Sequence, residues 1–484
     1  MTETRIWLIP LAGLLVLAAC GGANDGPAPE PTHTGLTVIG GRDQQGPPAA
    51  ALPVPVSAQL SDAAGSPVGA GMMVYWTVVM GGGTVSADST PTAVNGTAQV
   101  TWTLGTGIGG QELLVTTASG DTARAHATST GAFTAVAGGG NVPERYSSDL
   151  WVAGGYAYTG TWNWFQRTAS VAGLIKVFQL SGGGAPILVD SVALPSVTTV
   201  SDLEVSPDGA WLVATAEGNS GQGLYVFSLA NPAKPTQQAF LGVSAGLHTG
   251  SLSVIGGKLY AFGAKNPSSP ALMIFNLSEV ADSIITVASS TPIPPNYGIH
   301  DTFVRNGICF TFVWNEGVYV YDVGNGVRGG TPANPVRVGD IKTSGGEAHN
   351  GWWFHNPATG QQKYLFVGQE GPGKIGSSSS GDIHVVDVSD LAAPVEVASY
   401  SMSGAGVHNF WMDEQDQRLY AAYYDGGVVA LDVSGTLAGS LASREMARFR
   451  PGGAGQTYTW GVMLHGGYLY TIDMLTGLWQ LGVP

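Results

Sequence analysis

The 484-residue chain has little charge and almost no cysteine. Only 11% of its residues are Asp, Glu, Lys or Arg, and 34 acidic residues against 19 basic ones give a formal net charge of −15. A chain this acidic is a poor partner for the phosphate backbone of nucleic acids, which leaves cations, neutral ligands or proteins as partners. Besides Cys20 the chain has one cysteine, Cys309, whose neighbours Ile308 and Phe310 indicate a buried thiol.

The chain also lacks the signature of long helices. No window after residue 20 shows a sustained 3.6-residue apolar period, whereas short alternating runs bounded by Gly, Asn-Gly or Asp-Gly recur from residue 36 to the C-terminus. Together with 72 glycines and 13 tryptophans, this pattern predicts an all-β protein.

The one long apolar run lies at the N-terminus, over Ile6–Ala19, and is too short for a membrane-spanning helix. It fits a secretory signal. Its end, Leu17-Ala18-Ala19-Cys20, resembles the bacterial lipobox, which implies removal of residues 1–19 and acylation of Cys20. We therefore expect a lipid anchor in a membrane, a flexible Gly/Pro-rich tether over 20–35, and an extracytoplasmic location at the outer membrane or cell surface. An ordinary signal peptide followed by a coincidental cysteine is the alternative.

Residues 36–131 contain about seven short alternating segments, which suit a two-sheet β-sandwich. The run "PVPVSAQLSDAAGSPVGAGMMVYWTVVMGGGTVS" followed by "NGTAQVTWTLGTGIGGQELLV" resembles bacterial Ig-like domains of the invasin and intimin type. Trp76 and Trp102 are the expected core aromatics. The resemblance implies a stalk or, less often, an adhesive surface.

Residues 132–484 have a different rhythm. Seven segments with the same order of turn signals can be aligned on one residue each, and these residues lie 53, 46, 52, 49, 59 and 52 positions apart. They are Asp149, Asp202, His248, His300, His349, His408 and Trp460. Repeats of this period predict a seven-bladed β-propeller. The seventh unit lacks a fourth strand, which we expect Ala132–Gly139 to supply, thereby closing the ring.

The third strands of these units carry a family resemblance. "IHVVDVSDLAAPVEVASYS" and "GVVALDVSG" resemble the LVIVD repeat of bacterial and archaeal surface propellers. The resemblance implies a propeller displayed at the surface and no shared reaction.

Candidate chemistry gathers where the innermost strands begin and where the second strands end, because both places lie at one face of the ring. Four consecutive units present histidine there, and neutral imidazoles with carboxylates are ligands for a divalent transition metal. The candidate metal ligands are His248, His300, His349 and His408, with Asp301, Asn350 and Asn409 as neighbours that orient them. The candidate ligand-binding residues are Asp149, Asp202, Glu217, Glu316, Glu370 and Asp425, and, from a long turn at the same face, Trp162, Trp164 and Arg167.

A purely architectural interpretation stays open, since His, Asp and Asn at strand starts also bond loop amides and recur through duplication. Three functions follow from the sequence. The first is a lipid-anchored binding or adhesion protein that recognises a protein, glycan or small molecule. The second is a metal-dependent enzyme, and the third is a structural envelope protein. No nucleophile elbow, phosphate-binding loop or Cys-pair metal motif is present in the sequence, so catalytic residues stay unassigned.

Overall fold

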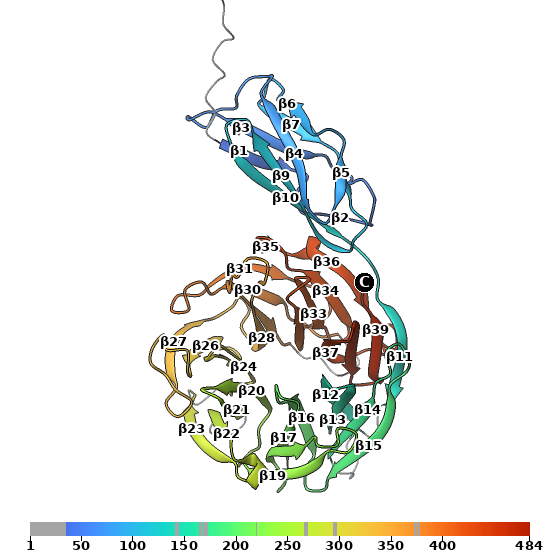
Figure 1. Cartoon of the computed structure of the whole chain (residues 1–484), viewed down its shortest axis with the longest axis vertical. Helices are drawn as coiled ribbons and strands as arrows, with labels where there is room; N and C mark the ends of the chain where they lie inside the picture. The colour runs from blue at the N-terminus through green and yellow to red at the C-terminus, as the bar shows by residue number, and fades with distance from the viewer. Residues whose placement is uncertain are drawn as a thin grey trace, which may run out of the picture.

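The computed structural model describes residues 35–140, 145–163, 167, 173–218, 220–265, 270–293, 298–371, 375 and 378–484. Cys20, the tether, and Trp164 therefore lie outside the described residues. Within the described part, regular structure is β strand apart from two 3-10 turns, η1 (Val280–Asp282) and η2 (Ala442–Arg444). The prediction of an all-β protein is confirmed (Figure 1).

The first part of the chain folds as two main sheets and a two-stranded ribbon. The first sheet has the order β1 (Gly35–Gly40), β3 (Val56–Ser61), β7 (Thr97–Val100). The second has the order β2 (Gln44–Gly46), β10 (Thr122–Ser129), β9 (Gly109–Thr117), β4 (Met73–Met80), β6 (Ser89–Pro91), and the ribbon pairs β5 (Gly83–Val85) with β8 (Trp102–Leu104). Along β3 and β9 every second residue is buried, as expected for strands with one face in a core. Both sheets contribute to one core, which contains Trp76 and Trp102.

From residue 134 onward the strands form a series of antiparallel sheets placed around a common centre (Figure 1). In the order innermost to outermost, the first three are β12 (Tyr146–Ala153), β13 (Tyr156–Trp162), β14 (Gly173–Gln179), β15 (Ile187–Leu194); β16 (Thr199–Val205), β17 (Trp211–Glu217), β18 (Gly223–Ser228), β19 (Thr236–Gly242); and β20 (Thr249–Ile255), β21 (Lys258–Lys265), β22 (Ala271–Asn276), β23 (Thr286–Pro292).

The next three sheets continue round the same centre. They are β24 (Asp301–Arg305), β25 (Ile308–Phe312), β26 (Val318–Asp322), β27 (Val336–Ile341); β28 (Ala348–Phe354), β29 (Tyr364–Gln369), β30 (Ile383–Asp387), β31 (Val395–Tyr400), to which β35 (Gly439–Ser440) adds by a short parallel pairing; and β32 (Phe410–Asp413), β33 (Arg418–Ala422), β34 (Val428–Asp432), β36 (Glu445–Phe449). Neighbouring innermost strands contact one another, and their apolar side chains fill the space between sheets. The arrangement is a β-propeller.

The last sheet joins the two ends of the propeller. It has the order β37 (Thr459–His465), β38 (Tyr468–Asp473), β39 (Gly477–Gly482), β11 (Thr134–Gly140), so a strand from the start of the propeller covers the edge left by the last one. The register runs from Thr134 opposite Gly482 to Gly140 opposite Gly477. At Gly138 a Cβ would lie 2.1 Å from the Trp479 ring, so this position requires glycine. The prediction that the segment before the first repeat supplies this strand is confirmed.

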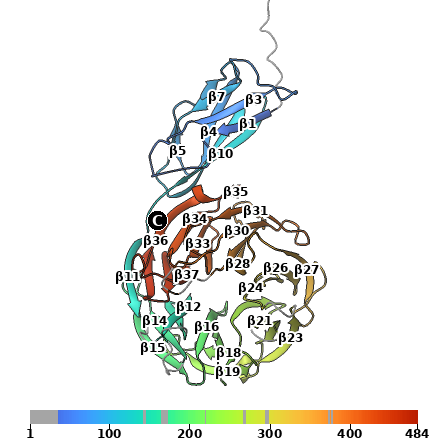
Figure 2. The ribbon, with the colours of Figure 1, turned by 180° about the vertical axis from the view of Figure 1, so that it is seen from behind.

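A buried polar contact joins the two-sheet part to the propeller, and both views show that part seated beside β35 and β36 (Figures 1 and 2). Asp432, at the end of β34, is 1% exposed. Its Oδ2 lies 2.8 Å from His126 Nε2 and accepts from Thr128 Oγ1 (3.3 Å), both on β10. Arg444, in η2, brings its Nη1 to 3.3 Å from the same oxygen. Of the histidines outside the repeat phase, His126 is therefore buried and paired across this joint.

Candidate functional site

Equivalent backbone bonds hold the repeat histidines at the start of their innermost strands. The amides of His248, His300 and His408 each donate to the carbonyl at the end of the neighbouring second strand, at Ala264, Phe312 and Ala422. His349 occupies the second position of β28. The shared pattern places four imidazoles at one level around the centre of the ring.

The four imidazoles meet. Ring centroids are 4.3 Å apart for His248 and His300, 3.8 Å for His300 and His349, and 4.3 Å for His349 and His408. The arc continues to Trp460, whose ring lies 4.0 Å from that of His408. Each histidine is at most 6% exposed. We call these four residues the histidine arc.

A carboxylate completes the cluster. Glu370 Oε2 lies 3.5 Å from His349 Nε2 and 3.9 Å from His300 Nε2, and Glu370 Oε1 accepts a hydrogen bond from the Tyr424 hydroxyl. One ligand atom each of His300, His349 and Glu370 lies within 4.8 Å of the other two, and all three residues are buried. Two imidazoles and one carboxylate are a donor set that zinc and other first-row metals accept.

Several imidazole nitrogens have no hydrogen-bond partner among the described residues. These atoms are His300 Nδ1, both ring nitrogens of His349 and His408 Nε2, and all are buried. A buried polar atom without a partner costs about 1–3 kcal/mol, so these four nitrogens are candidate donor atoms for a ligand. The other nitrogens are engaged at the ends of the arc, where His408 Nδ1 lies 2.7 Å from the Trp460 carbonyl and His248 Nδ1 lies 3.0 Å from Glu217 Oε1. Such bonds fix ring orientation and leave the opposite nitrogen free for a metal.

Electrostatics keeps most of the arc neutral. Burial, and the neighbouring imidazoles, lower the pKa of His300 and His408 well below the ordinary value, and burial lowers the pKa of His349 to about 3. Burial also disfavours the charged form of His248, but the Glu217 carboxylate outweighs it, so that pKa is raised. Burial raises the pKa of Glu370 to about 7 against the opposing bond from Tyr424. Neutral imidazole is the form that binds metal.

Aromatic side chains enclose the arc. Trp162 lies edge-on to His248 (centroids 5.6 Å apart), Trp314 to His300 (4.7 Å), and Tyr424 to His408 (5.1 Å). Trp314 and Tyr424 have φ of +46° and +38°, a left-handed conformation that bulky residues rarely adopt. Strain of this kind persists where the surroundings hold it and collects at functional sites. Sequence reasoning missed both residues, although each occupies the same place in its repeat, two positions before the turn's Glu-Gly or Gly-Gly pair.

The structure places the other predicted site residues either at the arc or in the turns and loops around it. Glu217 and Trp162 join the arc, as does Glu370. Glu316 is half-buried in its turn. Asp425 accepts from the Ser379 amide (3.1 Å), and Arg167 donates to the Arg145 carbonyl (3.1 Å) and lies over the Tyr146 ring, so both hold loops in place.

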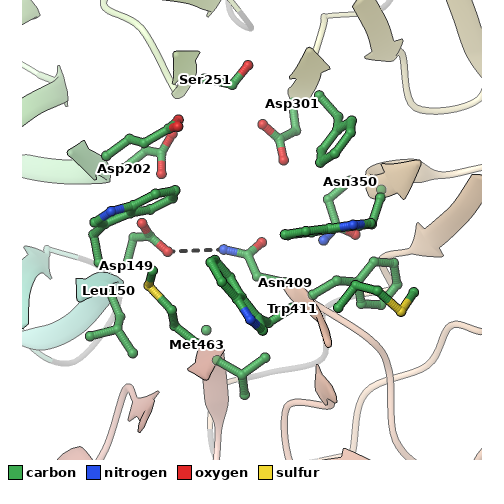
Figure 3. Close-up of a pocket in the computed structure, with 18 of the residues that line it drawn as sticks. Asp149, Leu150, Asp202, Ser251, Asp301, Asn350, Asn409, Trp411 and Met463 are labelled. Carbon is green, nitrogen blue, oxygen red and sulfur yellow. Dashed lines mark hydrogen bonds between the residues drawn. The ribbon is translucent and has the colours of Figure 1, made fainter. Parts of the chain in front are cut away.

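The structure corrects the predicted alignment of the repeats at Asp149 and Asp202. They line a separate cavity together with Asp301, Asn350 and Asn409, each of which directly follows a histidine or its aligned position (Figure 3). The pairing of their strands shifts by one residue between Ser147 and Leu150 and between Val200 and Asp202. Strand β28 has the same shift between Ala348 and Asn350, with His349 inside it, so Asp202 is equivalent to Asn350 and lies one position beyond the place that the turn signals give it.

The ring of sheets and its buried centre define this chain as a β-propeller, and comparisons with known proteins agree with that class. The model of the LVIVD repeat matches residues 144–165 and 378–402. No curated protein matches the chain.

Two solved propellers are similar to it in outline. The β-propeller domain of Myceliophteria thermophila Cps50 (Swd1) has 12% identity, covers 71% of this chain and 99% of its own, and has a TM-score of 0.48. The C-terminal WD40 domain of Sif2 has 10% identity, covers 78% and 90%, and has a TM-score of 0.44. At these scores the fold rests on the chain's own sheets and on the LVIVD matches. Among the described residues, no helix is long and apolar enough to span a membrane.

Proposed function

We propose that this chain is a lipid-anchored protein of the cell envelope in which an Ig-like domain presents a seven-bladed propeller, and that the propeller binds a divalent transition metal through His300, His349 and Glu370. One observation carries the metal assignment: the ligand atoms of these three buried residues lie within 4.8 Å of one another. The unpartnered nitrogens of the same cluster support it.

The donor set narrows the metal to the first-row transition series. Two imidazoles and a carboxylate favour Zn²⁺, Fe²⁺, Ni²⁺ or Cu²⁺ over Mg²⁺ or Ca²⁺, which take oxygen ligands. His408 Nε2 is a further free donor beside His349. Three protein ligands leave positions for water or a substrate, which is the arrangement of catalytic rather than structural zinc.

Metal analysis of the purified full chain, produced in metal-supplemented medium, tests this assignment. We expect about one transition metal ion per chain, because the described residues contain one compact donor cluster. The double variant His300→Ala/His349→Ala should lose at least nine-tenths of it, whereas His465→Ala, at the half-buried end of β37, should retain it. Circular dichroism checks that each variant is folded. A folded double variant that keeps its metal, or a wild-type chain without metal, contradicts the proposal.

The lipid anchor has its own test. The sequence Leu17-Ala18-Ala19-Cys20 supports acylation of Cys20, and several acyl chains, at about 0.8 kcal/mol per buried methylene, hold a protein at a membrane. Mass spectrometry of the mature N-terminus should find acylated Cys20, and Cys20→Ala should abolish membrane association. Cys309→Ala, which changes the buried thiol, is the matched control. An unmodified mature N-terminus contradicts the anchor.

A binding function is the second candidate, and the cavity that holds Asp149 and Asp202 favours it. Its lining combines carboxylates with exposed aromatic edges, as ligand sites do. This candidate does not depend on the metal.

A further inference from the structure

The cavity lies at the centre of the ring and has a volume of about 600 Å³, within the range of small-molecule sites. Figure 3 shows Asp202, Asp301, Asn350 and Asn409 converging on one space from different strands, with Asp149 below them. The lining belongs to the innermost strands of several sheets, so a ligand there touches the most rigid part of the fold.

The lining is strongly acidic. It contains six carboxylates and, among the described residues, one Lys or Arg. That residue, Arg305, forms a two-bonded ion pair with Glu414 at the edge of the cavity, including Nη2 to Oε2 at 2.9 Å, so its charge does not reach the centre. The described lining therefore has no further Lys or Arg for its other carboxylates, which include Asp149, Asp202, Glu204 and Asp301.

Backbone amides satisfy only part of this acidic group. Asp202 accepts from the Gly250 amide (2.7 Å), Glu204 from the Leu252 amide (2.8 Å), and Asp149 from Asn409 Nδ2 (3.1 Å). The first two bonds tie neighbouring innermost strands together, the third joins β12 to the residue before β32, and all three donors are neutral. Burial accordingly raises the pKa of Asp149, beside Asp202, and of Glu204 well above the ordinary values.

Asn350, which is 3% exposed, also lines the cavity. Its Oδ1 lies beside Gly368, the residue that pairs with it on β29, so the carboxylates of Asp202 and Asp301 are the acceptors that the cavity offers to a cation.

Half-buried tryptophans form the wall nearer to solvent. Trp411 lies between Trp151 (ring centroids 6.1 Å apart) and Trp352 (5.2 Å), and Phe303 lies 5.2 Å from Trp352. Tryptophan faces attract organic cations and pack against alkyl chains. The tryptophans thus suit the apolar end of a ligand, and the carboxylates suit its positively charged end.

From this arrangement we propose that the cavity binds a small organic molecule with a primary ammonium group on an apolar stem. The ammonium group meets Asp202 and Asp301, and its N–H donors match their carboxylate oxygens. The stem lies against Trp411 and Trp352.

A bare metal ion fits this cavity less well. Within the described residues, the only trio of His, Cys, Asp or Glu ligand atoms within 4.8 Å of one another is that of His300, His349 and Glu370. No three of the described cavity carboxylates therefore bring ligand atoms that close together, whereas Ca²⁺ needs six to eight oxygens at about 2.3–2.6 Å. The spacing leaves room for an ammonium group and its stem.

Isothermal titration of the full chain with n-butylammonium, in a buffer of constant ionic strength, tests the proposal. We expect saturable binding at one site, and none with 1-butanol, which has the same stem without the charge. Asp202→Asn keeps the side chain's size and removes its charge, and should weaken binding about tenfold or more, equivalent to about 1.4 kcal/mol. Trp411→Leu removes the aromatic face and should weaken it several-fold. Asp88→Asn makes the same change at an exposed position of the two-sheet part and should leave binding unaltered.

Three outcomes overturn the proposal. One is absence of saturable heat with n-butylammonium, and another is equal affinity in wild type and in a folded Asp202→Asn or Trp411→Leu variant. The third is complete displacement by millimolar CaCl₂ at matched ionic strength, which identifies an inorganic cation site. None of these results bears on metal content at the histidine arc, so the two proposals fail separately.

Discussion

The joint at Asp432 yields a prediction whose size follows from the structure. Replacing Asp432 with Ala leaves the Arg444 guanidinium, 5% exposed, without its carboxylate at 3.3 Å. It also removes the acceptor of His126 and Thr128. The nearest remaining carboxylate, Asp43, is 3.9 Å away and 48% exposed, so solvent screens it. Breaking a buried ion pair from one side costs about 3–5 kcal/mol, and we expect that loss in the free energy of unfolding.

The repeat itself provides a matched control. Asp387 occupies the same place at the end of its third strand, but it pairs at the surface with Lys363 at 3.2 Å. Asp387→Ala should therefore cost only about 0–1 kcal/mol. Urea denaturation followed by tryptophan fluorescence measures both variants, and small-angle scattering measures the angle between the two parts. We expect Asp432→Ala alone to broaden the distribution of overall dimensions.

The pH dependence of the joint has a definite sign. Burial disfavours the Asp432 carboxylate, but the bonds from His126, Arg444 and Ser434 outweigh burial and lower its pKa below 3.8. A carboxyl with a lowered folded pKa stabilises the fold above its unfolded pKa, and this contribution fades as the pH falls through the folded value. The wild-type joint should thus survive at pH 5. Equal unfolding free energies for Asp432→Ala and Asp387→Ala at pH 7 would refute the reasoning.

Two further predictions concern the propeller. Asp322 accepts five backbone amides, from Gly324, Asn325, Gly326, Arg328 and Gly330, so Asp322→Ala should lower the free energy of unfolding by about 3 kcal/mol in urea denaturation. Burial opposes its charge, but these amides lower its pKa to about 2, so in wild type this stabilisation is complete above pH 3.8 and should fade between 3.8 and 2. Gly138→Ala, whose Cβ would meet the Trp479 ring at 2.1 Å, should lower the melting temperature by several degrees, whereas Gly182→Ala, with open space around its Cβ, should not. Equal melting of the two glycine variants would contradict the packing at the ring closure.

The three equivalent aspartates show where sequence reasoning stops. Asp322, Asp387 and Asp432 all end a third strand of the repeat, and nothing in the repeat pattern distinguishes them. The structure gives them different partners: a loop's amides, a surface lysine and a neighbouring part of the chain. Those partners come from insertions and from distant segments, which the repeat does not encode.

The repeat does determine equivalent positions, and it therefore made the histidine arc predictable. Repeat phase alone brings His248, His300, His349 and His408 to one level, because equivalent strands are placed identically around the ring. Which carboxylate meets them depends on turn conformation, and Glu370 and Glu217 reach the arc. Strands β16 and β28 share one bulge, and the residue inside it is Ser201 in β16 but His349 in β28, so Asp202 lies one position beyond the histidine level.

Closure of the ring by β11 also determines how the propeller carries mechanical load. The chain from the proposed anchor reaches the propeller through Gly131, whose amide donates to the Met446 carbonyl at 2.9 Å, and continues directly into β11. A pull on the anchor is therefore directed along β11, against its ladder with β39. Hydrogen bonds loaded along the strand direction share the force, whereas bonds opened one at a time from an edge do not. The strand that completes the ring would thus also carry tension from the proposed anchor into the propeller, after the joint at Asp432 and the bond of Gly131.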